Sequence, residues 1–247
     1  MRTAVLSDIH GNAYALEAVL SDVKKRSADF LLNLGDILYG PIAPRSTYDL
    51  LMEHDFVTIR GNQDRQIYEN ASNEIESNPT LSFILKDLGR KPIDWLRSLP
   101  FDCRLTDEIY LCHGTPTNDL GYLLERIETG RAGVRPDKEI LELLNGKSAK
   151  VILCGHTHTP RTVELSTGQL VVNPGSVGLP AYTDEEPVLH SMENFSPHAS
   201  YAMLEKVALG WTVQHIKVAY DYHRAAKKAA RCDRSDWVHF LITGRGL

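Results

Sequence analysis

The sequence contains no long hydrophobic run. Its apolar stretches are short, and none approaches the roughly 20 residues that a helix needs to cross a bilayer. The first residues, MRTAVLSDIHGN, have only a brief apolar stretch before Asp8 and His10, which does not resemble a secretory signal. We therefore expect a cytoplasmic protein that makes no use of a membrane.

Cysteine is also scarce. The four cysteines, Cys103, Cys112, Cys154 and Cys232, form no C-x-x-C pair, so neither a disulfide framework nor a cysteine-rich zinc motif is indicated. Cys112 and Cys154 end apolar runs, which predicts that they are small buried residues. This pattern fits the reducing conditions of the cytoplasm.

The chain lacks an excess of positive charge. With 27 Lys and Arg against 32 Asp and Glu, its net charge is -5, so no general attraction to nucleic acid or an anionic membrane is expected. A nuclease is therefore unlikely on charge grounds. The hydrophobic fraction of 43% is ordinary for a globular protein, and we find no repeat or linker in the 247 residues. We expect a single domain over residues 1–247.

The hydrophobic periodicity predicts an α/β fold. Strands expected at 3–7, 30–34 and 56–59 alternate with helices at 13–26 and 45–54, which indicates parallel strands with helical crossovers. Residues 65–98 read as a helical insertion, and the C-terminal tail from Asp221 as helical. The remaining expectations are a loop before a helix at 137–145, a long loop at 179–198, and strands at 101–105, 108–112, 150–154, 161–165, 169–172, 200–207 and 211–219.

Five clusters of polar residues each follow a predicted strand. Sites in α/β sheets form outside the carboxyl ends of the strands, so these clusters are expected to converge. Taken alone, the His-x-His in LCGHTHTP would more often be a histidine pair in a surface turn. The clusters are Asp8 with His10, Asp36, Asn62 with Asp64, His113, and His156 with His158.

The residue types in these clusters suggest two metal ions. Two carboxylates, one amide oxygen and four imidazoles exceed the needs of one ion, and suit two ions about 3.5–4 Å apart that share a carboxylate. Mixed nitrogen and oxygen ligands favour Mn, Fe, Zn, Co or Ni over Ca or Mg. The candidate metal ligands are Asp8, His10, Asp36, Asn62, His113, His156 and His158.

The order D-x-H-G-N, G-D, G-N-x-D, H-G and G-H-T-H resembles the calcineurin-like metallophosphoesterases, from Leu6 to about Gly178. NPGSVG at 173–178 is similar to the YfcE-like group of small bacterial and archaeal phosphodiesterases. The resemblance implies a four-layer α-β-β-α sandwich of two facing mixed sheets flanked by helices. It also implies two divalent or trivalent ions, with Mn favoured. Metal one would take Asp8, His10, Asp36 and His158, and metal two Asp36, Asn62, His113 and His156.

The same resemblance implies hydrolysis of a phosphate ester by in-line attack of a metal-bridging hydroxide. The expected catalytic residues are Asp36, Asn62, Gln63, Asp64 and His113. The family often carries histidine inside G-N-x-D, where this chain has Gln63, and glutamine cannot act as a general acid. We therefore expect a phosphodiesterase for small esters or nucleotides with good leaving groups.

Other functions of the same fold stay open. These are a dinucleoside polyphosphate hydrolase, a protein or monoester phosphatase, and a cyclic nucleotide phosphodiesterase. A non-catalytic scaffold is disfavoured because all seven ligand positions are filled. Specificity is expected in loops 39–48, 65–98 and 179–198, and a homo-oligomer is left open.

Weaker candidates each have a structural alternative. Arg60 and Arg65 could contact a substrate phosphate, but arginines in such positions more often form structural ion pairs. Tyr39 could stack on a base or pack in its turn. His190 and His198 could supply a proton to the leaving group, although a surface loop is the commoner role for their segment.

Overall fold

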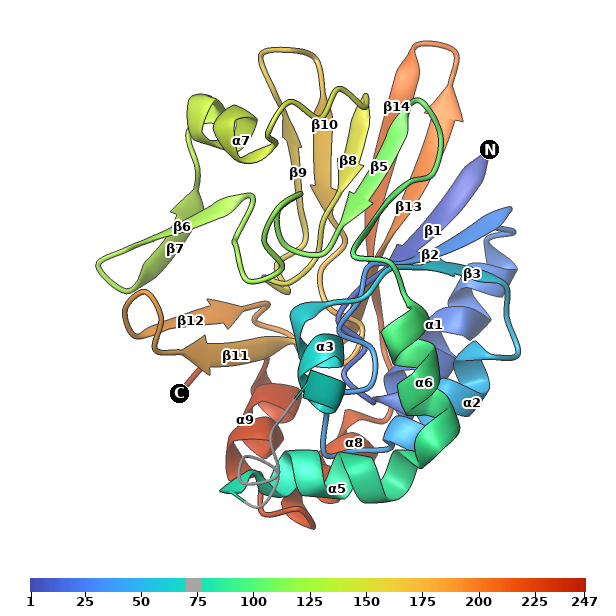
Figure 1. Ribbon diagram of the computed structural model, residues 1–247, viewed down its shortest axis with the longest axis vertical. Coiled ribbons are helices and arrows are strands. Elements are labelled where there is room, and N and C mark those ends of the chain that lie inside the picture. The colour runs from blue at the N-terminus through green and yellow to red at the C-terminus, as the bar shows by residue number, and fades with distance from the viewer. Residues whose placement is uncertain (70–76) are drawn as a thin grey trace.

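The computed structural model describes residues 1–69 and 77–247, and these form two five-stranded sheets (Figure 1). The first sheet has the order β14-β13-β1-β2-β3 and the second β4-β5-β8-β10-β9. The strands of the first are β1 (Arg2–Leu6), β2 (Phe30–Asn33), β3 (Phe56–Thr58), β13 (Ala199–Val207) and β14 (Gly210–Val218). Those of the second are β4 (Asp102–Arg104), β5 (Ile109–Cys112), β8 (Val151–Leu153), β9 (Arg161–Glu164) and β10 (Leu170–Asn173).

Each sheet contains three neighbouring parallel strands, β1, β2 and β3 in the first and β5, β8 and β10 in the second. The other strands, β13, β14, β4 and β9, pair antiparallel with their neighbours. The helices are α1 (Ala13–Lys25), α2 (Pro44–Leu51), α3 (Asn62–Glu69), α5 (Pro79–Leu88), α6 (Arg90–Ser98), α7 (Asp137–Leu143), α8 (Tyr222–Ala230) and α9 (Ser235–Thr243). The predicted β-α-β-α-β opening is therefore confirmed.

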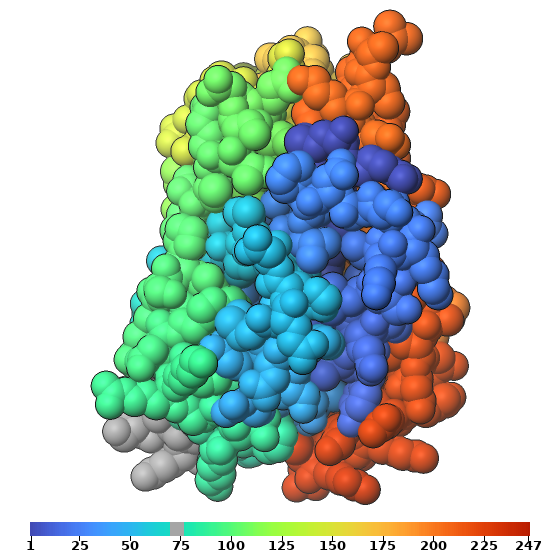
Figure 2. Space-filling model, turned by 90° about the vertical axis from the view of Figure 1, so that its right-hand side faces the viewer, coloured from blue at the N-terminus to red at the C-terminus, as the bar shows by residue number. Residues whose placement is uncertain are grey.

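Helix α1 shows how the sequence sets this arrangement. The Asn12 side chain accepts a hydrogen bond from the Ala15 backbone N–H and caps the helix start. Leu16, Val19 and Val23 then fall on one helix face and are buried against the first sheet. Figure 2 shows this side of the molecule, where residues 1–60 (blue to cyan) lie between the β13–β14 hairpin at the top and the C-terminal segment at the bottom.

Apolar side chains fill the space between the two sheets. Val5 and Leu32 of the first sheet pack in one cluster with Leu111 and Leu153 of the second, and all four are fully buried. Complete burial of such side chains contributes about 1.5–3 kcal/mol each. Other clusters join the outer sheet faces to helices, so the expected four-layer α-β-β-α architecture is confirmed.

Two regions differ from the expectation. The segment 179–198, expected to be a loop, contains the hairpin of β11 (Ala181–Asp184) and β12 (His190–Glu193). The segment before α7 contains the hairpin of β6 (Glu125–Glu128) and β7 (Arg131–Val134). β7 is exposed throughout, so no alternation of apolar and polar residues marks it in the sequence.

The predicted helical insertion at 65–98 is helical in its described residues apart from Asn78 and Gly89, and residues 70–76 lie outside the described residues. It includes most of α3 and all of α5 and α6, and α6 packs against α3. The tail is two helices, α8 and α9, that pack on each other. In the described part of the chain, no helix has both the length and the hydropathy of a membrane span.

Candidate metal centre

The carboxyl ends of strands from both sheets meet at one place. Asp8 follows β1, Asp36 follows β2, and Asn62 follows β3 at the start of α3, whereas His113 follows β5 and His156 follows β8. Two sets of donor atoms result, each within a span of 4.8 Å. The first is Asp8, His10 and His158, and the second is Asp36, His113 and His156. The Asn62 Oδ1 lies 3.0 Å from the His113 Nε2, so the structure brings all seven predicted ligands together.

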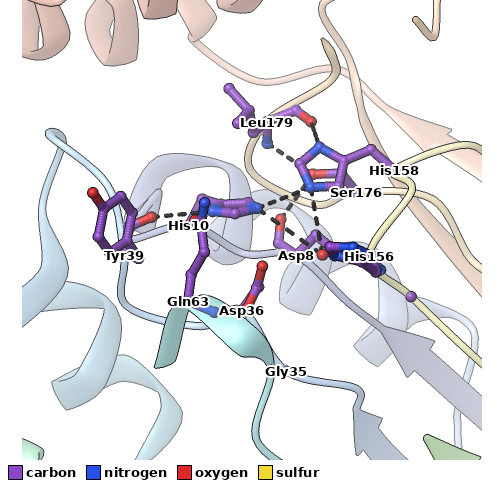
Figure 3. A network of polar contacts seen from close by, with 12 residues as sticks. Asp8, His10, Gly35, Asp36, Tyr39, Gln63, His156, His158, Ser176 and Leu179 are labelled. Carbon is purple, nitrogen blue, oxygen red and sulfur yellow. Dashed lines mark hydrogen bonds and ion pairs between the residues drawn. The ribbon is translucent and has the colours of Figure 1, made fainter. Parts of the chain in front are cut away.

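Backbone carbonyls orient three of the imidazoles. The Nδ1 of His10 lies 3.1 Å from the Tyr39 carbonyl, and that of His158 lies 2.7 Å from the Leu179 carbonyl (Figure 3). The Nδ1 of His113 lies 2.8 Å from the Leu34 carbonyl. A carbonyl only accepts, so each Nδ1 carries a proton, and in the neutral ring, the form that binds a metal ion, each Nε2 presents a lone pair. This is the arrangement that metal-ligating histidines use.

The first set has the geometry expected around a cation. The Nε2 atoms of His10 and His158 are 3.0 Å apart, and both are lone-pair donors in the tautomer that the carbonyls impose. Such a contact needs a positive charge between the two nitrogens. The Asp8 Oδ1 lies 3.4 Å from the His158 Nε2, is buried, and has no hydrogen-bond partner within residues 1–69 and 77–247. A buried unpaired carboxylate oxygen is costly, and a metal ion would satisfy it.

The second set is centred on Asp36. Burial by itself would raise the pKa of Asp36, but the facing imidazoles of His113, His10 and His156 hold that pKa well below its usual range. Burial also opposes the charge on His113, yet Asp36, 3.5 Å from its Nε2, raises the pKa of His113 to about 10. Burial, reinforced by the charge of His113, lowers the pKa of His156 to about 4. Asp36 is thus a carboxylate that attracts positive charge, as a metal ligand does.

The backbone of the site is strained. Five candidate ligands have a left-handed backbone, a conformation that costs non-glycine residues of the order of 1–3 kcal/mol each. Surrounding contacts must hold them there, and strain of this kind concentrates at functional sites. These ligands, with their φ angles, are Asp8 (54°), His10 (50°), Asp36 (52°), His156 (69°) and His158 (58°).

Asp64 provides part of that support. Its Oδ1 accepts hydrogen bonds from the backbone N–H groups of Ile37 (2.8 Å) and Leu38 (3.3 Å), and its Oδ2 accepts one from Gly61 (3.0 Å). The carboxylate therefore fastens the loop after β2, which carries Asp36, to the turn before α3. Asp64 is fully buried and does not line the cavity described below. Its geometry is that of a residue that positions others.

The NPGSVG segment fastens the loop that carries Asp8. The Ser176 hydroxyl donates to the Asp8 carbonyl at 2.8 Å, and the Gly178 N–H donates to the same carbonyl at 3.0 Å. Close approach also explains Gly155 in the GHTH turn. A Cβ at this position would lie 2.1 Å from the Ser7 Oγ, so only glycine fits.

Comparison with known proteins decides the family. The calcineurin-like phosphoesterase superfamily domain matches residues 1–194. The chain belongs to this superfamily. An uncharacterized protein of Methanocaldococcus jannaschii is 25% identical in an alignment of 258 positions, which covers 98% of each chain. The crystal structure of a metallophosphoesterase from Sphaerobacter thermophilus aligns with a TM-score of 0.76 at 24% identity, over 99% of this chain and 100% of that one. YfcE, a phosphoesterase of E. coli, aligns with a TM-score of 0.45 at 22% identity, over 89% of this chain and 100% of that one.

The family match confirms the resemblance to the calcineurin-like phosphoesterases. Membership of the calcineurin-like phosphoesterases implies a hydrolase of phosphate esters, and the chemistry of the two sets of donors fits a metal ion at each. The first set corresponds to metal one and the second to metal two. Asp36 lies between the two sets, because its carboxylate faces His113 and its charge acts on His10.

In this phosphoesterase the metal centre forms the floor of a cavity of about 860 Å³. Sequence reasoning expected specificity in the segment 179–198, which supplies Tyr182, but it named none of the wall residues given below. They lie singly in hairpins, loops and the C-terminal helix, where no motif marks them, and α9 lies beyond the matched domain. The floor residues are His10, Asp36, Asn62, Gln63, His156 and His158. The missed wall residues include Leu120, Tyr122, Ile127, Arg135, Tyr182, Arg234, Trp237 and Phe240.

The weaker candidates fall into two groups. Arg65 pairs with Asp119 through two hydrogen bonds of 3.0 Å, which is the structural ion pair, and neither Arg60 nor Arg65 lines the cavity. Tyr39 lines the cavity, and its carbonyl orients His10. His190 is buried beside Tyr122, outside the cavity lining, and His198 does not line the cavity either.

Proposed function

We propose that this chain is a phosphodiesterase that hydrolyses small organic phosphodiesters whose leaving group is already a good one. The observation that carries the proposal is Gln63, which occupies the cavity floor beside Asp36. The position that would suit a general acid is therefore held by a side chain that cannot give up a proton at neutral pH.

The centre fits two ions by its ligand chemistry, and manganese is the metal that we propose. Bound metal ions would lower the pKa of a water molecule and stabilise the charge that develops on the phosphate oxygens. Asp36 would serve both ions. Asn62 offers a neutral oxygen, which leaves the site less negative than another carboxylate would and so favours an anionic substrate.

Gln63 is placed to bind the phosphate rather than to protonate the leaving group. Its backbone N–H donates to the Asp36 Oδ1 at 2.8 Å, which fixes the residue next to the metal centre. Its side chain lines the cavity, and the Oε1 is buried without a hydrogen-bond partner among the described residues. The amide can donate a hydrogen bond to a phosphate oxygen, but it transfers no proton.

The tyrosines on the walls do not replace the missing acid. Burial raises the pKa of Tyr122 to about 12 and raises that of Tyr182 well above its usual value. Both hydroxyls are also engaged, because Tyr182 donates to Tyr122 at 2.9 Å and Tyr122 lies 3.0 Å from the His190 Nε2. Esters of poorly acidic alcohols, which need a proton at the leaving oxygen, are therefore disfavoured.

One observation favours a second candidate, a dinucleoside polyphosphate hydrolase. The cavity is large, and Arg135 and Arg234 both line it, so further phosphates of an extended substrate could meet guanidinium groups. Each arginine already contacts a carboxylate, Glu139 for Arg135 and Asp236 for Arg234. Because these charges are already partnered, we rank this candidate below the diesterase.

The test replaces Gln63 with histidine and measures kcat/KM on diesters of graded leaving-group pKa, with Mn²⁺ added. The Gln63→His gain should be largest for the poorest leaving groups, and should reach the order of 10²-fold that general acid catalysis supplies. The wild-type rate should fall steeply as the leaving-group pKa rises.

Gln169 provides a matched control, because it lies outside the cavity and its amide bonds only to the Lys147 and Ala149 carbonyls and to Thr167. Gln169→His should leave the slope of the series unchanged. A uniform effect of Gln63→His across all leaving groups would show that Gln63 does not mark a missing acid. Wild-type protein that binds metal but hydrolyses none of the esters would contradict the proposed function itself.

A further inference from the structure

Tyr122 forms a wall of the cavity directly beside the metal centre. It lies in the loop before β6, and its ring centroid is 5.2 Å from that of His156. Tyr182, on β11, lies next to it, with its ring centroid 4.7 Å from that of His158. Both rings line the cavity into which a substituent of a phosphate at the metal centre would extend.

The Tyr122 ring is held from both ends. The His190 Nδ1 lies 2.8 Å from the Val188 carbonyl and must donate to it, so the His190 Nε2 accepts the hydrogen bond of the Tyr122 hydroxyl at 3.0 Å. The same hydroxyl accepts a hydrogen bond from Tyr182 at 2.9 Å. At the other end, the Arg135 Nε donates to the Tyr122 carbonyl at 3.1 Å. The ring is therefore preorganised, and a ligand that uses it loses little entropy in ordering it.

These hydrogen bonds also decide which part of Tyr122 faces a ligand. Its hydroxyl contacts two residues of the β11–β12 hairpin, Tyr182 and His190. The part of Tyr122 that is left to contact a ligand in the cavity is therefore its ring. Leu120 and Ile127 line the cavity beside it, and Leu120 is 54% exposed. An exposed leucine next to a fixed aromatic ring makes an apolar wall in a cavity whose floor is polar.

We propose that Tyr122, Leu120 and Ile127 form a subsite that binds a planar aromatic group on the retained arm of the substrate, either an aryl group or a nucleobase. The inference rests on the proposed phosphodiesterase function and names the substrate class for it. A flat group stacks on the fixed ring and covers the leucine, whereas a methyl arm reaches neither. Stacking of a base on an aromatic side chain strengthens binding by roughly tenfold or more.

The experiment compares three diesters with the same leaving group, p-nitrophenolate, and with different retained arms. These are methyl p-nitrophenyl phosphate, bis-p-nitrophenyl phosphate and thymidine 5′-p-nitrophenyl phosphate. Wild-type protein should prefer at least one aromatic arm to methyl in kcat/KM. The Tyr122→Leu change should lower that preference by about tenfold, whereas Tyr122→Phe, which keeps the ring, should retain it to within about threefold.

Two controls make the result specific. Tyr222 lies on α8 away from the cavity lining, so Tyr222→Leu should leave the preference unchanged. Ile127→Ser is a second test of the apolar wall. It replaces Tyr122→Leu if that variant is unfolded at the temperature of the assay. A fall confined to the p-nitrophenyl arm would identify an aryl subsite, and a fall confined to thymidine would identify a base subsite.

The inference is overturned if the wall variants lower neither preference by more than twofold. Its failure is separable from failure of the proposed function. If no diester were hydrolysed at all, the subsite could still be tested by equilibrium dialysis, which would measure the binding of thymidine 5′-monophosphate and of methyl phosphate to the protein. The nucleotide should then bind about tenfold more weakly to Tyr122→Leu than to wild-type protein, with methyl phosphate unaffected.

Discussion

The floor and the walls of the cavity are built in different ways. On the floor, side chains lie at the ends of strands, and backbone carbonyls fix several of them, as the Leu34 carbonyl fixes His113 and the Tyr39 carbonyl fixes His10. On the walls, side chains fix one another, as Tyr182 and His190 fix the Tyr122 hydroxyl.

The difference indicates that the floor of the cavity carries the catalytic groups, whereas the walls select the substrate. The floor tolerates strained backbone at Asp8, Asp36 and His156 because two sheets and their hydrogen bonds hold it. The walls come from short elements, one of which, α9, lies outside the matched domain. We therefore expect floor variants to change catalysis and metal affinity, and wall variants to change substrate preference.

The largest effect is expected for Asp36→Asn. The carboxylate belongs to the second set of donors and its charge also acts on His10 of the first, so its loss removes charge that favours two cations at the centre. We expect kcat/KM to fall by about 10³-fold, the upper range for the loss of one group that stabilises charge at an active site. Calorimetric titration with Mn²⁺ should show at most one ion bound in place of two.

Asp107→Asn is the control, because Asp107 is fully exposed and distant from the cavity lining. It should bind two ions and keep wild-type kcat/KM. If Asp36→Asn still bound two ions with wild-type affinity, the distinction between a floor made for chemistry and walls made for selection would break down.

A smaller effect is expected for Asp64→Asn. Both carboxylate oxygens accept backbone N–H groups, from Ile37, Leu38 and Gly61, and an amide NH₂ would face one of these donors. The loop that carries Asp36 should loosen, so metal affinity should fall by about 10- to 100-fold, the range for residues that orient ligands. Calorimetric titration with Mn²⁺ measures this change.

The Asp64→Asn variant distinguishes a residue that positions metal ligands from one that takes part in the reaction, because Asp64 does not line the cavity. Added metal at high concentration should restore most of its activity, which would not occur for a group that takes part in the reaction. An activity loss at saturating metal, with affinity unchanged, would instead place Asp64 in the chemistry.

The smallest effect is expected for Leu120→Ser on the wall. Leu120 is 54% exposed, so its loss should not alter the melting temperature or the affinity for Mn²⁺. The KM for bis-p-nitrophenyl phosphate should rise by roughly threefold, since removal of part of an apolar contact costs under about 1 kcal/mol. A weaker metal affinity in this variant would show that the walls and the floor are coupled.

Much of the fold follows from local sequence. Apolar spacing in α1, the Asn12 cap and the short apolar runs of β1, β2, β5 and β8 mark these elements directly, because burial selects their residues. The hairpins β6–β7 and β11–β12 were missed since few of their side chains are buried, as the exposed β7 shows. Nothing in such segments repeats with the period of a strand.

The sequence by itself determined the ligand types of the metal centre and their order, because short motifs such as G-H-T-H follow the strands that carry them. Only the tertiary structure decided which nitrogen of each histidine is available, that Asp64 binds backbone rather than substrate, and that Tyr122 presents its ring. These depend on carbonyls and hydroxyls that lie far away in the chain. Local patterns record burial and turns, but not the partners that long-range packing brings to a side chain.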